Sequence, residues 1–232
     1  MRILVINWQD RKNPFAGGAE VHLHQIFGRI ASLGHRVTLL CCSFPGSPLH
    51  EIVDGIEVVR LRGLRNIFNF ILFLSYRKRA YRKKYDLVVE DINKIPFYAP
   101  LWAGCPVLAV VPHLFGRTIF EEIPYPLALY IYLWEPPIPW VYRNSPFLVI
   151  SESTREDLVR RGIKSEKIEV IPCGLDSTVY HRSGEKARYP LVCYLGRLKR
   201  YKRVDLLLQA MSIVLRKMPE ARLTIMGDGD AR

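Results

Sequence analysis

Short apolar runs alternate along the chain with segments whose apolar residues recur roughly every three or four positions. The short runs predict buried β-strands, and the periodic segments predict helices packed against them. We expect strands at residues 2–8, 35–44, 55–62, 85–93, 106–113, 147–153 and 168–176. We expect helices at residues 19–34, 66–83 and 95–104, and another from Ser153 onward. This alternation predicts an α/β fold with a parallel, Rossmann-like sheet.

The pattern changes after residue 176. Residues 177–190 are polar and without periodicity, which is typical of a linker. A strand, a helix over 202–217 and a further strand then follow within residues 191–232. One βαβ unit buries too little apolar surface to stand alone. We therefore expect a domain at 1–176 and, at 191–232, the start of a truncated second domain.

Composition indicates a globular chain that binds anions. Hydrophobic residues make up 49% of the sequence, and the formal net charge is +12. The five cysteines form no CxxC motif, which favours a reduced, cytoplasmic chain. The N-terminus does not resemble a secretory signal, and no apolar run reaches the ~18–20 residues that span a bilayer.

Positive charge is concentrated at one turn between a predicted strand and a predicted helix. Five bases lie within seven residues: Arg197, Lys199, Arg200, Lys202 and Arg203. Such a turn either is a solvated basic surface or binds a phosphate, since ligands of α/β sheets bind at the carboxyl ends of the strands. The residues alone leave both readings open.

Three stretches give the chain a family resemblance. They are FAGGAE (15–20), ISESTREDL with IEVIPCGLD (150–176), and YLGRLKRYKRVDLLLQA (194–210). In this order and spacing they resemble retaining, nucleotide-sugar-dependent glycosyltransferases of family four. The resemblance implies a Rossmann-like GT-B N-terminal domain with an incomplete second Rossmann-like domain.

The sequence departs from the family at two places. The family's second domain supplies a pair of spaced glutamates, and none of the glutamates in this chain forms such a pair. The family also has asparagine before the glycine of the proline–glycine loop, where this chain has Cys173.

The resemblance also implies site residues in the second domain. Arg197 and Lys202 would hold the donor diphosphate, with Lys202 at the start of the helix. Gly227 and Gly229 would lie on the nucleotide side, although a turn at a strand end explains them equally well.

In the first domain, His113 would approach the transferred sugar as a catalytic residue; a hydrogen-bonded histidine at a strand end is the plain alternative. Gly17 and Gly18 would form a glycine loop facing the acceptor and the donor phosphate, or a turn that needs positive φ. Ser151 is a substrate-side candidate by resemblance alone.

Two further patterns have structural explanations. Ser153 and Glu156 have the spacing of a capping box. His22 and His24 are two residues apart on a predicted helix and point to different faces, so we expect no metal site there. No cofactor is expected beyond the UDP- or GDP-linked sugar donor.

Residues 60–84 contain nine bases, no acid and several interleaved apolar residues. This composition is typical of a membrane-surface helix, and a crossover helix packed on the sheet is the alternative. The candidates for contact with an anionic membrane are Arg77, Lys78, Arg79, Arg82, Lys83 and Lys84. No nucleic-acid-binding motif is present.

Two functions remain open. The first is transfer of a hexose from a nucleotide sugar to a lipid-linked or polysaccharide acceptor, with retention and without a metal, by an enzyme peripheral on the inner face of the membrane. The second is a non-catalytic, truncated or split module that binds acceptor or membrane and needs a second chain to complete the site.

Overall fold

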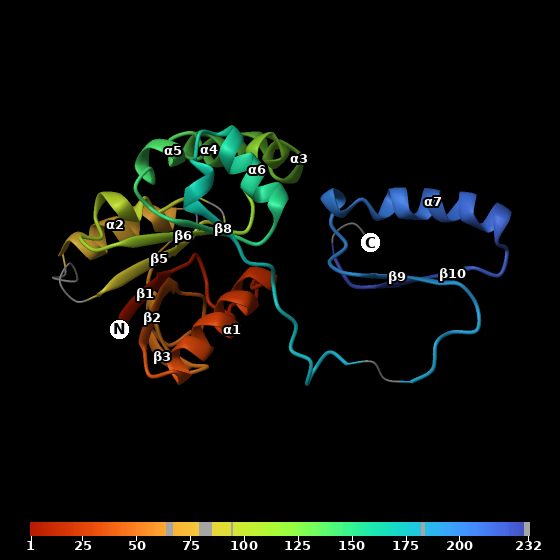
Figure 1. The fold of residues 1–232 in the computed structure, drawn as a ribbon, viewed down its shortest axis with the longest axis horizontal. Coiled ribbons are helices and arrows are strands. Elements are labelled where there is room, and N and C mark those ends of the chain that lie inside the picture. The colour runs from red at the N-terminus through yellow and green to blue at the C-terminus, as the bar shows by residue number, and fades with distance from the viewer. Residues whose placement is uncertain (64–66, 79–84, 94, 182–183, 230–232) are drawn as a thin grey trace. The chain divides into compact units, whose positions relative to one another are not determined.

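The computed structural model describes residues 1–63, 67–78, 85–93, 95–181 and 184–229. The chain divides into two compact units, each with its own sheet. Unit 1 comprises Met1–Ile119 and Tyr125–Gly174, and unit 2 comprises Phe120–Pro124 and Leu175–Arg232. Figure 1 draws both units as ribbons.

A sheet of eight strands forms the centre of unit 1 (Figure 1). The strands lie in the order β3-β4-β2-β1-β5-β6-β7-β8, and every described pair is parallel except β3–β4. The predicted Rossmann-like α/β fold is therefore confirmed. The strands are β1 (Arg2–Ile6), β2 (Arg36–Cys42), β3 (His50–Val53), β4 (Ile56–Leu61), β5 (Leu87–Asp91), β6 (Val107–Val111), β7 (Phe147–Val149) and β8 (Ile168–Val170).

The sequence did not predict β3. It pairs antiparallel with β4 through a turn in which Asp54 and Gly55 have φ of 54° and 77°. The four residues HEIV form the outermost strand and include two polar side chains. They therefore lack the apolar run by which the inner strands were recognised.

Side chains of the inner strands are buried on both faces of the sheet. In β1, Leu4 and Ile6 enter one hydrophobic cluster, whereas Ile3 and Val5 enter another. Since successive side chains of a strand point to opposite faces, the two clusters lie on opposite sides of the sheet.

Helices cover both clusters. Helix α1 (Gly18–Ser32) packs Leu23 and Phe27 on the cluster of Ile3 and Val5. Helices α2 (Phe68–Lys78) and α4 (Tyr125–Trp134) pack on the cluster of Leu4 and Ile6. The other helices of this part of the chain are α3 (Ile119–Glu122), α5 (Ile138–Val141) and α6 (Glu152–Arg160), with 3₁₀ turns η3 (Ala99–Leu101), η4 (Gly116–Thr118) and η5 (Ser165–Lys167).

Two predicted helices differ from the structure. The predicted helix at 95–104 is wrong, because only η3 forms there. The buried carboxylate of Glu90 accepts hydrogen bonds from the N–H groups of Phe97 and Ala99, and Tyr98 between them is left-handed, with φ 53°. The predicted helix at 66–83 is described as α2 between Phe68 and Lys78, and the rest of that range lies outside the described residues.

A buried ion pair connects the β1–α1 loop to the sheet. Arg60 of β4 donates from Nε and Nη2 to both carboxylate oxygens of Asp10, at 2.7 and 3.0 Å, and both side chains are fully buried. Burial alone would raise the pKa of Asp10, but hydrogen bonds from Arg60 and from the backbone of Lys12 hold it below its usual value. Arg60 also donates to Glu51 and to the carbonyl of Pro48.

Unit 2 contains one βαβ motif among its described residues. β9 (Leu191–Leu195) pairs in parallel with β10 (Arg222–Met226), and α7 (Val204–Lys217) connects them after the 3₁₀ turn η6 (Arg200–Lys202). Exposed apolar side chains occur on both strands and on the helix, among them Leu195, Leu208, Ile213 and Met226.

Backbone pairing of the two strands continues beyond their carboxyl ends. The N–H of Gly196 donates to Met226, and the N–H of Leu198 donates to Asp228. The partner strand comes so close that a Cβ at Gly227 would lie 1.8 Å from the carbonyl oxygen of Gly196. A Cβ at Gly229 would lie 2.2 Å from that of Leu198. Both glycines also have positive φ, 155° and 158°.

We predict that Arg60→Met lowers the free energy of unfolding by about 3–5 kcal/mol in urea denaturation, because the carboxylate of Asp10 would remain buried without its partner. Adding Asp10→Asn should recover part of this loss, since it removes the buried charge. The control is Arg2→Met, which breaks the exposed pair with Asp86 and should have little effect. Equal losses for Arg60→Met and Arg2→Met would contradict the assignment.

We predict that Gly227→Ala separates the strand ends of unit 2, because neither backbone can yield the space for a Cβ. Amide exchange at Gly196 and Leu198 should accelerate by about tenfold or more, which corresponds to losing at least one backbone hydrogen bond. Gly174→Ala is the matched control, since no atom lies within 4 Å of its added Cβ. Unchanged exchange at Gly196 would show that the close approach is absent.

Candidate functional site

The sheet of unit 1 has a topological switch point between β1 and β5. The chain passes from β1 to β2 on one side and later returns to β5 on the other. Ligands of open α/β sheets bind at this place, outside the carboxyl ends of the strands. Asn7 and Gln9 follow β1 there, and Asn93 follows β5.

These three amide side chains are nine-tenths or more buried. Asn93 Nδ2 donates to Asn7 Oδ1 at 2.9 Å across the switch point, and Gln9 Nε2 donates to the carbonyl of Phe15. In the described part of the chain, Asn7 Nδ2, Gln9 Oε1 and Asn93 Oδ1 have no hydrogen-bond partner. Such atoms usually bind water or a ligand, and here they offer uncharged donors and acceptors suited to hydroxyl groups.

The glycine loop lies beside this point, at the start of α1. Gly17 is the N-cap, and its N–H donates to Glu20 Oε2 at 2.6 Å. Gly18 is the first helical residue, and a Cβ there would meet no atom within 4 Å. Neither glycine has positive φ, so the alternative of a turn that requires it is wrong. The open space at Gly18 permits a ligand to approach the backbone closely.

Two pairs hold the loop that leads to these glycines, one fully buried and one with an exposed carboxylate. The first is Asp10 with Arg60. In the second, the Nδ1 of His24 bonds Asp54 Oδ2 at 3.0 Å, and the N–H of Arg11 donates to His24 Nε2 at 3.4 Å. Burial lowers the pKa of His24 although Asp54 opposes the shift, so the ring is neutral and can accept from Arg11. His24, which lies in α1, therefore has a structural role: it holds the loop through the N–H of Arg11.

His113 follows β6 and is exposed at its carboxyl end. Hydrogen bonds hold the loop on both sides of it. Thr154 Oγ1 donates to the carbonyl of Pro112 at 3.0 Å, and the N–H groups of Phe115 and Gly116 donate to Glu135 at 2.8 and 2.9 Å. The ring of Phe115 lies edge-on to His113, with 4.9 Å between centroids. The loop that carries the imidazole of His113 is thus held in place by hydrogen bonds on both sides.

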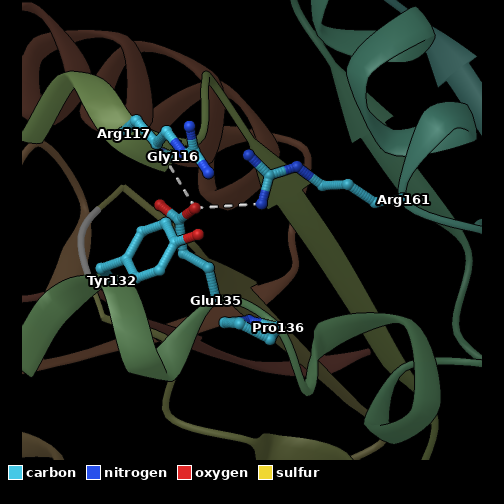
Figure 2. A pocket seen from close by; sticks show the side chains of 6 residues that line it. All are labelled: Gly116, Arg117, Tyr132, Glu135, Pro136 and Arg161. Atoms are coloured by element: carbon cyan, nitrogen blue, oxygen red, sulfur yellow. Dashed lines mark hydrogen bonds and ion pairs between the residues drawn. The ribbon is translucent and has the colours of Figure 1, made fainter.

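Glu135 joins this loop to α6. Its carboxylate is 1% exposed and also accepts from Arg161 Nη1 at 3.0 Å, while Arg161 Nε donates to Asp157 at 2.8 Å. Figure 2 shows Glu135 and Arg161 facing one another, with Arg117 and Tyr132 beside them. These residues line a cavity of about 290 Å³ together with Gly116 and Pro136.

Ser151 has a structural role in the described residues. It is the N-cap of α6, and its hydroxyl accepts from the N–H of Thr154 at 3.3 Å. The predicted capping box of Ser153 and Glu156 is therefore wrong. The helix begins at Glu152 because the extended backbone of Ser151 places its side chain, rather than that of Ser153, over the first free N–H groups.

In unit 2, Arg197 and Lys202 are exposed and lie on the segment between β9 and α7. Local backbone bonds fold this segment: the N–H of Lys199 donates to Arg197, and that of Lys202 donates to Lys199. The expectation that Lys202 begins the helix is wrong. It ends η6, and α7 begins at Val204 because left-handed Arg203 interrupts the helical path with φ 51°.

A further basic residue of this turn forms a local ion pair. Arg203 donates to both carboxylate oxygens of Asp205, at 3.2 and 3.1 Å, which supports its reading as a solvated surface residue. Gly227 and Gly229 face Gly196 and Leu198, so they set the path of the backbone that carries Arg197. Their structural role is thus clear, and their nucleotide-side role stays a prediction.

The proposed membrane contact lies largely outside the described residues. Arg79, Arg82, Lys83 and Lys84 are not described, and only the backbone of Arg77 and Lys78 is described, in α2. Among the described residues, none of the helices is both long and apolar enough to cross a membrane. Nor do those residues include a group of three His, Cys, Asp or Glu side chains that could hold a metal ion.

Sequence reasoning did not single out the switch-point amides or Glu135. Asn7 and Asn93 could have been found, since each is a polar residue at the carboxyl end of a predicted buried strand. Glu135 carried no such signal, because it lies in an aromatic, proline-rich stretch far from Phe115 and Gly116 in sequence.

We predict that Glu135→Gln loosens the loop around His113. An amide has one acceptor oxygen in place of two, so Phe115 or Gly116 loses its partner. Hydrogen bonds to charged groups contribute about 1.5–3 kcal/mol, so amide exchange there should accelerate roughly tenfold to a hundredfold. Glu152→Gln, which alters an exposed pair with Arg155, should leave this exchange unchanged. Equal protection in both variants would show that Glu135 does not hold the loop.

Solved structures share this fold. The chain superposes on Anabaena HepE, solved in complex with UDP-glucose, with a TM-score of 0.64 and 16% identity over 98% of this chain and 61% of HepE. The lipopolysaccharide outer core galactosyltransferase WaaB matches with a TM-score of 0.59 and 16% identity over 99% of this chain and 62% of WaaB. The trehalose 6-phosphate synthase of Burkholderia multivorans matches with a TM-score of 0.54 and 14% identity over 97% of this chain and 62% of the synthase. The chain thus spans less than two thirds of the length of these proteins.

Family models match both units, whereas no curated protein matches the chain in sequence. The model of glycosyl transferases group 1 matches residues 177–232. The model of Glycosyltransferase Family 4 matches residues 16–179, which include the glycine loop, His113 and the whole sheet from β2 to β8. The chain therefore belongs to Glycosyltransferase Family 4.

Proposed function

We propose that the chain takes part in transfer of a hexose from a UDP- or GDP-linked sugar to a lipid-linked or polysaccharide acceptor. The observation that carries this proposal is the loop at the carboxyl end of β9, where Arg197 and Lys202 are exposed on a backbone paired with Gly227–Gly229. Anions bind at this edge of α/β sheets. HepE, which has this fold, was solved with UDP-glucose and with UDP.

In the proposed reaction, the bond between the sugar carbon and the diphosphate oxygen breaks, and the acceptor oxygen forms a bond to the same carbon. The diphosphate leaves with the electron pair, and Arg197 and Lys202 stabilise its growing negative charge. The acceptor proton passes to the released diphosphate. The two cations would take the place of a divalent metal, and the configuration of the sugar would be retained.

Unit 1 is proposed to supply the acceptor side. His113 is exposed on a fixed loop, so it could hydrogen-bond the transferred sugar without first becoming ordered. The partly unsatisfied amides of Asn7, Gln9 and Asn93 favour uncharged hydroxyl groups nearby. We place the protein on the inner face of the membrane, in polysaccharide biosynthesis, where lipid-linked acceptors occur.

A second candidate function is that of a module which needs a further polypeptide to become active. The exposed apolar side chains of unit 2 favour it, because Leu195, Leu208 and Ile213 are each more than half exposed. In this case the chain binds acceptor or membrane, and turnover requires a second chain that completes the active site. Turnover by the isolated chain would exclude this candidate.

We predict that UDP or GDP binds the chain in calorimetry, and that Arg197→Ala and Lys202→Ala each weaken the affinity by about tenfold to a hundredfold. The reason is the loss of one charge-assisted hydrogen bond to the diphosphate, about 1.5–3 kcal/mol. Arg216→Ala is the matched control, because it removes the same charge from the far end of α7. Equal affinity in all variants, or no binding by the parent chain, would refute the diphosphate assignment.

A further inference from the structure

Helix α2 exposes apolar side chains on the face that points away from the sheet. Phe68 and Leu72 are completely buried in the core, whereas Phe70 and Leu74 are 47% and 56% exposed. Phe73 is exposed as well. The face of a surface helix that contacts water normally carries polar residues. The apolar face of α2 is therefore unusual for a helix in contact with water alone.

Helix α4 has the same property and contains no charged residue in its ten positions, YPLALYIYLW. Tyr125, Leu129 and Leu133 recur every fourth residue and therefore lie on one face. Leu133 is 60% exposed, and the other two are exposed as well. Ala128, by contrast, is completely buried.

The two exposed faces belong to one surface. The rings of Phe70 and Trp134 meet edge to face with 5.5 Å between centroids, and Tyr130 Oη donates to Asn69 Oδ1 at 3.4 Å. Both helices bury their other sides in the same cluster beneath them. The α2–α4 surface, defined as Phe70, Phe73, Leu74, Tyr125, Leu129 and Leu133, therefore faces outward from a single layer.

The sequence that follows the apolar face of α2 indicates what covers this surface. Six bases occur in the eight residues 77–84, directly after the apolar face of α2, and no Asp or Glu occurs between Val58 and Tyr85. An apolar helix face followed in sequence by clustered bases matches the acyl chains and the anionic head groups of a lipid bilayer. A contact with another protein would not by itself call for one-sided positive charge.

We propose that the α2–α4 surface is the membrane-docking face of the protein, with its apolar side chains inserted into an anionic bilayer. This inference rests on the proposed function and deepens it, because a lipid-linked acceptor would lie in the membrane that this surface contacts. It assigns residues of α4 and α2 to one docking face, and it makes insertion of apolar side chains as necessary as the basic residues.

The test is co-sedimentation of the full chain with vesicles of phosphatidylcholine that contain phosphatidylglycerol, and with vesicles of phosphatidylcholine alone. The parent chain should bind the anionic vesicles, and salt should weaken binding. The variant Phe70→Ser with Leu133→Ser should partition roughly a hundredfold less, since about half or more of each side chain is exposed in water and would be buried in lipid. Leu129→Ser with Leu133→Ser should show a similar loss while leaving the packing of α2 intact.

The matched control is Leu33→Ser with Ile52→Ser, which removes two side chains that are each 77% exposed elsewhere in unit 1. It should bind vesicles like the parent chain. The proposal is overturned if the parent chain does not bind anionic vesicles, or if the α2–α4 variants bind as well as the control. It is also overturned if light scattering shows a dimer that only the α2–α4 variants convert to monomer, because a second copy would then cover the surface.

Calorimetry with UDP on the same variants separates this inference from the proposed function. The α2–α4 variants should bind UDP like the parent chain, because their substitutions lie outside the loop of Arg197 and Lys202. Loss of vesicle binding with unchanged UDP binding supports the docking face alone. Absence of UDP binding in every chain, with vesicle binding intact, would refute the proposed function and leave the docking face standing.

Discussion

Parallel pairing of the strands is the constraint on which the rest of the structure depends. It places the carboxyl ends of β1, β5 and β6 at the same edge of unit 1, and those of β9 and β10 at the same edge of unit 2. Each loop after a strand therefore lies next to another such loop, although the residues are far apart in sequence. The amide pair of Asn7 and Asn93 is a direct result, because it joins residues 86 positions apart.

At each edge, contacts within the chain itself fix the loops. In unit 1, Asp10 with Arg60 holds the glycine loop, and Glu135 holds the loop of His113. In unit 2, the close backbone approach at Gly227 and Gly229 holds the loop of Arg197. His113, Arg197 and Lys202, which we assign to the sugar donor, are exposed, whereas the residues that hold their loops are buried or lack a Cβ. This division is expected of a preorganised site.

The sequence predicted the repeating βα order, and with it the sheet and most of its strands, because a strand buried on both faces forms an unbroken apolar run. It could not predict β3, whose edge position lacks that run, or η3, which exists because Glu90 binds the N–H groups of Phe97 and Ala99. It placed His113 and Arg197 at the carboxyl ends of strands, and in the structure they follow β6 and β9. The end of η6 at Lys202 and the partners of Glu135 depend on left-handed backbone and long-range contacts, which local periodicity does not encode.

The most direct measurement is a crystal structure of the chain with bound UDP. The account predicts that the diphosphate lies at the carboxyl end of β9, with its oxygens about 3 Å from both the guanidinium of Arg197 and the ammonium of Lys202. A diphosphate bound at another place, or one that neither cation touches, would contradict the account.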